Sequence, residues 1–543
     1  MRQAGRIIHG GIHQAAAAIH DKEMTLLRAE KLMKNTVVGV LSQAIITLTA
    51  FITQYVFIAY MTTEYLGARG LFSAILEFLS LAELGIGMVL VYSMYKPIVD
   101  KDERKLIALT QFYKRAYDLI AALVFGVGMC LMPFLSFFIE DMDSVPHARL
   151  IYFLYLVSSA SSYLWVYKMS ILNADQKVYV IHVCSAVFSI LQCVGQVIVL
   201  VTTRNFFLYL IIQTVAVVAK NIYISHVAQK LYPFLASKEK INLTKEEKNG
   251  IYKNVFAMFN HRVGATVLGS TDNLLITKFI GIIYCGFYSN FKLIVNLMNA
   301  FLNQFFNAML SSVGNLTTSE SKEASYHTFK YLHFLSFWVY TFCTVSFIEL
   351  ANPVIWVTFH REEFAFGFPT VLMIGLNFYV VGIRKVPLTF KEAMGLLWYD
   401  RYKPVIEAAI NVVVSIICIR RMGIAGIFFG TIFSMVATSI WVEPLVLFRH
   451  GFERSWGVFW RRNFVYFAFS GGLIALTHYI DVTFLSRLTE WTEVFAKLGV
   501  CLVVPNVIIA VCFCFTQEFR ELFAAVWGIF RKRLGTDAPA VEG

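Results

Sequence analysis

Apolar stretches recur along the whole chain and are separated by short polar segments. A helix of about 20 apolar residues is long enough to cross the hydrocarbon layer of a bilayer. A sliding window of about 19 residues predicts about fourteen such helices here. They start near Thr36, Leu71, Ala116, Leu150, Val178, Asn205, Val255, Ile282, Phe329, Phe368, Pro404, Gly423, Asn463 and Phe495. The pattern therefore predicts an all-α integral membrane protein.

One of these helices carries a polar face. In the stretch that starts near residue 282, polar residues occur at steps of four, three, four and four: Lys292, Asn296, Asn299, Asn303 and Asn307. These side chains share one face of a helix, over roughly 22 Å of its length. Because a polar group in hydrocarbon costs several kcal/mol without a partner or water, this face cannot point at lipid. It predicts a wet cavity inside the protein, and hence transport.

Three other predicted helices also have polar faces. The first carries Gly39, Gln43, Thr47, Ala50 and Gln54; the second carries Ser73, Glu77, Ser80 and Gly87; the seventh carries Arg262, Thr266, Ser270, Asn273 and Thr277. Uncharged polar groups of this kind also occur where neighbouring helices hydrogen-bond to one another, and this interpretation stays open for them. Ionisable residues such as Arg262, Asp272 and Lys292 more often mark a pathway, since inserting each costs at least about 2.5–3.5 kcal/mol. A structural pair of Arg262 with Asp272 between helices stays open as the alternative.

Two short patterns occur twice, six predicted helices apart. Gly70–Ser73 and Gly286–Ser289 both read glycine, apolar, aromatic, serine. The loops Asp175–Val178 and Asp400–Pro404 each pair an acid with a base. Because six is even, the repeats would be parallel, which predicts two six-helix lobes related by a pseudo-two-fold axis along the membrane normal. Two additional helices would follow the second lobe.

This organisation predicts six segments. They are an amino-terminal tail (1–35), an amino-terminal lobe (36–228), a basic linker (229–253), a carboxy-terminal lobe (254–450), the last two spans (451–530) and a carboxy-terminal tail (531–543). The first segment has neither a strongly apolar core nor a cleavage site, so it does not resemble a signal peptide. Its three histidines (His9, His13 and His20) favour an unstructured tail over a metal site.

Composition and charge agree with a membrane protein. The chain has 543 residues, of which 58% are hydrophobic and 15% charged, and its mean hydropathy is +0.63. With the amino terminus inside, about 35 of the 47 Lys and Arg residues fall in cytoplasmic segments, as positively charged loops should. We therefore expect both termini to be cytoplasmic. The net charge of +12 reflects this topology, and no soluble basic domain is present to bind nucleic acid.

The nine cysteines lie in or beside apolar stretches. Their spacing fits neither paired metal ligands nor a disulfide framework. We expect them to be small core residues and expect no metal site from them.

Several strings match a known family pattern: Glu83–Gly87, Tyr92–Pro97, Asn173–Lys177, His261–Gly264, Ser270–Asn273, Gly286–Asn290 and Asp400–Pro404. From about Arg28 to Gly451, the chain resembles the polysaccharide transporters of the multidrug/oligosaccharidyl-lipid/polysaccharide exporter superfamily. These are bacterial flippases of lipid-linked sugar repeat units. The resemblance is specific to the family and does not extend to a particular substrate.

The resemblance implies two lobes around a cationic central cavity that opens alternately to each side. The expected cargo is a polyprenyl-diphosphate-linked oligosaccharide, moved from the cytoplasmic to the outer leaflet of the bacterial cytoplasmic membrane. Arg262 and Lys292 would neutralise the diphosphate. Amides would replace water around the sugar hydroxyls, and the candidates are Asn273, Asn296, Asn299, Asn303, Gln43 and Gln54. Membrane lipids and the glycan polymerase machinery are further expected partners.

Three acidic residues, Asp272, Glu77 and Glu83, are candidates for coupling transport to protons or sodium. No cofactor is expected, and the cytoplasmic segments contain no phosphate-binding glycine loop followed by Lys-Ser or Lys-Thr. A drug or cation exporter of the same superfamily is the main alternative, although its cavity should be dominated by acidic residues. A membrane glycan polymerase or glycosyltransferase is a weaker alternative, because the loops predicted outside are too short for a catalytic platform. We therefore expect a transporter that is not an enzyme.

Overall fold

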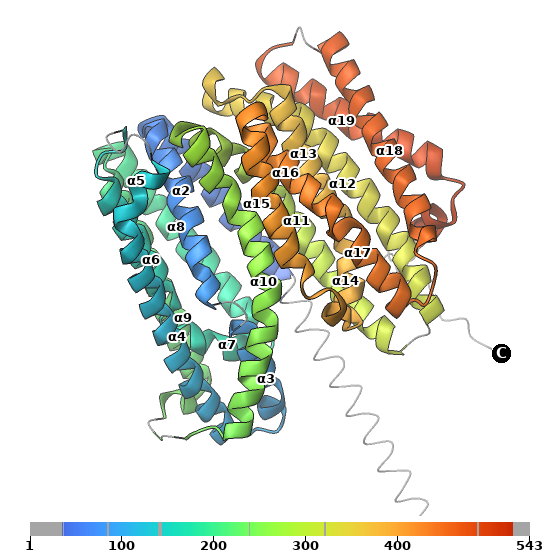
Figure 1. Ribbon diagram of the computed structural model, residues 1–543. Helices are drawn as coiled ribbons and strands as arrows, with labels where there is room; N and C mark the ends of the chain where they lie inside the picture. The colour runs from blue at the N-terminus through green and yellow to red at the C-terminus, as the bar shows by residue number, and fades with distance from the viewer. Residues whose placement is uncertain are drawn as a thin grey trace, which may run out of the picture. The chain divides into compact units, whose positions relative to one another are not determined.

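The computed structural model describes residues 35, 37–83, 86–139, 144–237, 239, 241–319, 322–485 and 488–524, and these residues form helices and short connections without a strand (Figure 1). Among them, ten helices are long and apolar enough to cross a membrane. The count becomes eleven if the bent pair Ala148–Tyr163 and Val166–Ala174 is one span. The predicted all-α, multi-pass membrane architecture is confirmed.

The first half of the chain contains the helix Val37–Tyr60, α2 (Thr63–Leu79), α3 (Ile86–Val99), α4 (Glu103–Leu131), α5 (Leu135–Phe138), α6 (Ala148–Tyr163), α7 (Val166–Ala174), α8 (Val178–Thr203), α9 (Phe206–Leu231) and α10 (Lys245–Phe279). The second half contains α11 (Ile282–Ser319), α12 (Lys322–Phe359), α13 (Phe368–Ile383), α14 (Lys385–Ala393), α15 (Lys403–Met422), α16 (Ile424–Ala437), α17 (Ser439–Val446), α18 (Gly457–Ile480) and α19 (Glu490–Phe513). Each predicted span coincides with one of these helices or with a consecutive pair.

The sequence predicts about fourteen spans, more than the ten or eleven apolar spans among the described residues, and the difference has a physical reason. The α2–α3 pair, α10 and α11 are not among the apolar spans. These elements carry three of the four polar faces seen in the sequence. Breaks within spans have a local cause where proline is present: Pro387 has no amide hydrogen to donate to the carbonyl of Ile383, and α13 ends at that residue.

The chain forms two compact units. Unit 1 comprises residues Met1–Tyr60, Ala82–Met132 and Arg149–Met258. Unit 2 comprises Met61–Leu81, Pro133–Ala148 and Phe259–Gly543, so that α2 belongs with α11. The boundaries of the two predicted lobes stay a prediction.

Within unit 2, α2 and α11 pack closely through glycines. A Cβ atom on Gly67 would lie 1.9 Å from the carbonyl oxygen of Ile282, and one on Gly286 would lie 2.9 Å from that of Thr63. No larger residue fits at Gly67 without moving a backbone. Gly70 also faces α11, because a Cβ atom there would lie 2.9 Å from Sγ of Cys285. The segments Gly70–Ser73 and Gly286–Ser289 therefore lie on two helices in close contact.

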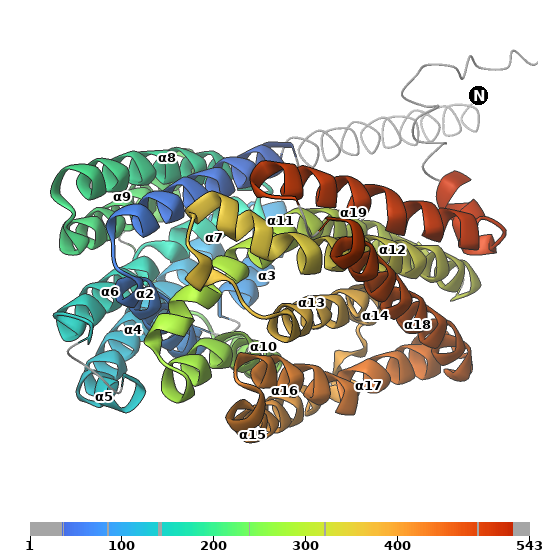
Figure 2. The same ribbon diagram turned by 90° about the horizontal axis from the view of Figure 1, so that it is seen from above.

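An aromatic core holds the carboxy-terminal helices of unit 2 together. Phe337 of α12 and Tyr466 of α18 stack with ring centroids 4.2 Å apart, and Phe513 of α19 lies 5.5 Å from Phe337. Both α18 and α19 contact α12, and Figure 2 shows them beside it. Aromatic pairs of this kind contribute about 0.5–1.5 kcal/mol beyond their burial. The last two spans are thus firmly attached to unit 2.

Candidate functional site

The polar residues of α2, α10 and α11 form a cluster in unit 2, which we call the Asp272 cluster: Glu77, Asp272, Asn273 and Lys292. Asp272 is only 7% exposed and interacts electrostatically with Lys292 and Glu77. Lys292 is half-buried and Glu77 is exposed. Glu77 approaches α10 at Gly269, where a Cβ atom would lie 3.5 Å from its Oε1. The structure therefore brings together four of the residues that the sequence singled out.

The Asp272 cluster has unsatisfied hydrogen-bonding capacity. Nδ2 of Asn273 donates to the carbonyl oxygen of Gly70 at 3.2 Å and ties α10 to α2. However, Oδ1 of Asn273 and Oδ1 of Asp272 are buried and accept no hydrogen bond from the described residues. Each such acceptor costs about 1–3 kcal/mol. A site that retains them is suited to a cation, a proton or a donor from a ligand.

The nearby hydroxyl groups on α10 do not satisfy these acceptors. Oγ of Ser270 donates to the carbonyl oxygen of Thr266 at 2.7 Å, and Oγ1 of Thr277 donates to that of Asn273 at 2.8 Å. For these two residues, the interpretation of polar side chains as structural hydrogen-bonding groups fits the geometry.

The rest of the polar face continues along α11. Asn299 and Asn303 are half-buried and Asn296 is exposed. The side chains of Arg262 and Asn307 lie outside the described residues, so the predicted pairing of Arg262 with the cargo stays a prediction. The described part of the face thus joins a cationic group, Lys292, to a row of amides on the same helix.

Three of the predicted site residues belong to unit 1. Nε2 of Gln43 donates to Oγ1 of Thr47 at 3.4 Å, and Gln54 is buried. Glu83 is half-buried and accepts a hydrogen bond from the hydroxyl of Tyr117 at 3.3 Å. Gln43 and Glu83 thus have hydrogen-bond partners within the unit, and their predicted roles in binding and coupling stay predictions.

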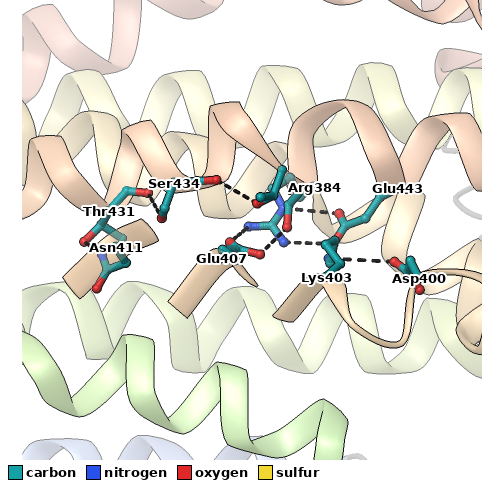
Figure 3. Close-up of polar contacts among 10 residues, drawn as sticks. Arg384, Asp400, Lys403, Glu407, Asn411, Thr431, Ser434 and Glu443 are labelled. Atoms are coloured by element: carbon teal, nitrogen blue, oxygen red, sulfur yellow. Dashed lines mark hydrogen bonds and ion pairs between the residues drawn. The ribbon is translucent and has the colours of Figure 1, made fainter. Parts of the chain in front are cut away.

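A second polar region, which sequence analysis missed, lies among the helices α13 to α17 of unit 2. Figure 3 shows the guanidinium of Arg384 between the carboxylates of Glu443 and Glu407. Its Nη2 and Nε lie 2.8 and 3.2 Å from the two oxygens of Glu443, and its Nη1 lies 3.3 Å from Oε1 of Glu407. Arg384 thus pairs bidentately with Glu443 and makes one hydrogen bond to Glu407.

Further ion pairs extend this region. Lys403 binds Glu443 and lies 3.9 Å from Oδ2 of Asp400, which Lys391 also binds. Ser439 donates to Glu407. Nδ2 of Asn411 donates to Oγ1 of Thr431 at 2.7 Å (Figure 3). We call the charged residues the Arg384 network: Arg384, Lys391 and Lys403 against Asp400, Glu407 and Glu443.

The Arg384 network is electrically balanced, with as many cations as anions, and its six charged groups are mostly buried. Removing one partner from such a network leaves an uncompensated buried charge. The sequence offered little sign of it, because Arg384 is 23 residues from Glu407 and 59 from Glu443. The sequence pattern indicates only the pair of an acid and a base in the loop of Asp400 and Lys403. We interpret the network as a structural device.

Unit 1 contains a basic cavity of about 480 Å³ between α4, α7, α9 and residues 233–237. Lys114, Arg115 and Lys168 line it together with a single acidic residue, Asp118. The ammonium of Lys168 donates to Oε1 of Gln229 at 3.1 Å, which holds it at the cavity wall. Three cations around one cavity fit an anionic group such as a phosphate.

Comparisons with known proteins were made at three levels. No family model matches the chain, and no curated protein matches it. Solved structures do match. An inward-facing multidrug resistance transporter of the MATE family superposes with a TM-score of 0.58 at 13% identity, covering 76% of this chain and 98% of its own.

Two further structures give the same result. The MATE multidrug transporter DinF-BH matches with a TM-score of 0.59 at 12% identity, over 78% of this chain and 95% of its own. A mutant of the Vibrio cholerae MATE transporter VcmN matches with a TM-score of 0.57 at 13% identity, over 78% and 98%. At these identities the likeness shows the fold alone. The chain has the fold of the MATE transporters of the multidrug/oligosaccharidyl-lipid/polysaccharide exporter (MOP) superfamily.

Proposed function

We propose that this protein is an exporter of the MOP superfamily that flips a polyprenyl-diphosphate-linked oligosaccharide from the cytoplasmic to the outer leaflet of the bacterial cytoplasmic membrane. The observation that carries the proposal is the Asp272 cluster, in which a half-buried lysine stands at the head of a row of amides on α11. A diphosphate and a hydrated sugar need a polar path across about 30 Å of hydrocarbon. Lys292 and the asparagines of α11 supply the right chemistry.

The cargo has two polar parts, and each has a matching set of residues. Lys292, with Arg262, neutralises the diphosphate by charge-assisted hydrogen bonds. Asn296, Asn299 and Asn303 offer both donors and acceptors, as sugar hydroxyls require. The basic cavity of unit 1, with Lys114, Arg115 and Lys168, lies at helix ends that we expect on the cytoplasmic side, where it captures the headgroup first.

Asp272 gives the transporter a means of coupling. While ionised, it attracts Lys292 and competes with the diphosphate for that ammonium. A proton or sodium ion at Asp272, assisted by Glu77, neutralises the carboxylate and frees Lys292 for the cargo. Binding of the coupling ion and binding of the diphosphate then favour each other. The proposal requires no bond chemistry, so purified protein should show no sugar transfer.

A drug exporter is the second candidate. Its support is the fold itself, because the matching structures are described as multidrug transporters. In that case Asp272 and Glu77 would bind a cationic drug directly, and Lys292 would be a competitor for them. The two candidates differ in the effect of removing the basic groups, since neutralisation would impair glycan flipping but improve binding of a cation.

The test is a flipping assay in vesicles that contain purified protein and a fluorescent polyprenyl-diphosphate oligosaccharide. Exposure of the lipid in each leaflet is measured by quenching, with cationic dyes assayed in parallel. We expect the wild type to flip the glycan lipid and the double variant Arg262→Gln/Lys292→Ala to lose flipping at least about tenfold, as loss of two charge-assisted contacts requires. Dye export without glycan flipping, or full flipping by the double variant, would contradict the proposal.

A further inference from the structure

Three potential metal ligands meet where α12 packs against the end of α18: Glu349, His478 and Asp481. One ligand atom from each lies within 4.8 Å of the others. Nδ1 of His478 lies 3.3 Å from Oε2 of Glu349. His478 and Asp481 are three positions apart, and a short π-helix begins at Asp481, a feature often found at functional sites. We call these residues the Glu349 triad.

The Glu349 triad contains buried oxygens that lack partners. Glu349 and Asp481 are 4% and 9% exposed. Oε1 of Glu349 and Oδ1 of Asp481 are both buried and accept no hydrogen bond among the described residues. Two neighbouring carboxylates that each keep a buried oxygen without a partner form an incomplete site, because such atoms normally meet a donor, a water or an ion.

The local charge also favours a cation. Lys497 of α19 lies 2.9 Å from Oδ2 of Asp481 and 2.9 Å from Oε1 of Glu493. This ammonium pairs with Asp481 and Glu493, and no cation among the described residues pairs with Glu349 other than His478, so ionised carboxylates outnumber the lysine at this place. Unbalanced charge is expensive in a span surrounded by lipid. A divalent cation would balance it.

We propose that Glu349, His478 and Asp481 bind a divalent transition-metal ion, with Zn²⁺ as the best match. One imidazole nitrogen and two carboxylate oxygens are common zinc ligands, whereas Mg²⁺ and Ca²⁺ prefer oxygen alone. The ring of Phe368 stacks on His478 at 3.9 Å and fixes the imidazole plane. Through the triad, the metal joins α12 to α18, and Lys497 extends the contact to α19, so that the ion anchors the last two helices to unit 2.

The test measures zinc in the purified full-length protein with any affinity tag removed. Because His9, His13 and His20 could bind metal by themselves, all three are changed to alanine in every sample. After chelation, reloading with Zn²⁺ and dialysis, we expect about one zinc per chain by mass spectrometry. The variants His478→Ala and Glu349→Gln should lose the ion, and added Zn²⁺ should raise the melting temperature only where the triad is intact.

His327 provides a matched control. Its two nitrogens lie 3.7 Å from carboxylate oxygens of Glu323 and Glu521, but it is more exposed than the triad. The variant His327→Ala should keep the zinc. If His478→Ala or Glu349→Gln retains it, or if only His327→Ala loses it, the proposed site is wrong.

X-ray absorption on the zinc-loaded protein with an intact triad gives an answer that does not depend on the folding of the variants. We expect one imidazole and carboxylate oxygens at about 2.0–2.2 Å. A spectrum without imidazole, or zinc below about 0.1 per chain after reloading, would overturn the proposal. A triad that binds only a proton would give this low zinc content.

Discussion

The Asp272 cluster and the Arg384 network both place ionisable groups inside unit 2, yet they differ in how these groups are satisfied. In the Arg384 network every carboxylate has a cationic partner, and the cations and anions are equal in number. In the Asp272 cluster Oδ1 of the buried carboxylate has no partner, and Lys292 is half-buried. Oδ1 of Asp400 in the Arg384 network is also buried without a hydrogen-bond partner among the described residues, but the other oxygen of that carboxylate binds Lys391. A direct ion pair to every carboxylate favours a fixed structure, whereas an unpaired carboxylate oxygen beside a half-buried lysine can bind and release a cation. The difference separates a structural region from the proposed transport site.

The largest effect should come from breaking the Arg384 network. In Arg384→Met, the carboxylates of Glu443 and Glu407 remain buried without their guanidinium, which should cost about 3–5 kcal/mol of stability. Thermal unfolding in detergent measures this loss, and the yield of monodisperse protein should fall. Arg420→Met, which changes an exposed arginine on α15, is the control and should shift stability by less than about 0.5 kcal/mol. Equal melting temperatures for the two variants would show that the network is not structural.

A smaller loss should follow from disturbing the contact between α2 and α11, which carry Glu77 and Lys292. In Gly67→Ala the new methyl group meets the carbonyl oxygen of Ile282, and overpacking of this kind costs about 1–3 kcal/mol.

Gly126→Ala is the matched control for that variant, because a Cβ atom there would meet nothing within 4 Å. It should leave stability unchanged or raise it by up to about 1 kcal/mol, since alanine favours the helix. The same melting temperature in both alanine variants would argue against the close helix contact.

The smallest change in stability is expected within the Asp272 cluster itself. Asp272→Asn keeps the size of the side chain and removes a buried charge, so stability should stay within about 1 kcal/mol of the wild type. Flipping, in contrast, should no longer respond to an imposed proton or sodium gradient, as measured in vesicles. A gradient response equal to that of the wild type would remove Asp272 from the coupling mechanism.

The sequence predicted the helices well because each apolar span is a local signal. It also predicted the polar face of α11, since a row of asparagines at helical spacing is visible in one segment. The Arg384 network was missed because Arg384 is 23 and 59 residues from Glu407 and Glu443, on elements that meet only in the folded protein. The Glu349 triad was missed for the same reason, as Glu349 stands alone in α12 far from His478 in the chain.

The repeat positions show a different kind of limit. The sequence marked the segments Gly70–Ser73 and Gly286–Ser289 as equivalent by pattern, but the pattern could not reveal that their helices touch, at Gly67 and Gly286 among other residues. Their contact depends on the absence of a Cβ atom on both helices, which is a property of the packed pair.

The central claim is that the Asp272 cluster binds the glycan lipid during flipping, and that Lys292 is needed for flipping and not for stability. Lys292→Ala tests it most directly, with Lys278→Ala of α10 as the matched lysine, since Lys278 lies 4.7 Å from the ring of Phe137 and off the polar face. Flipping of the glycan lipid and melting temperature are recorded for both variants. The account predicts at least about a tenfold loss of flipping for Lys292→Ala, with the melting temperature kept, and near wild-type flipping for Lys278→Ala. Equal flipping by the two variants would contradict it.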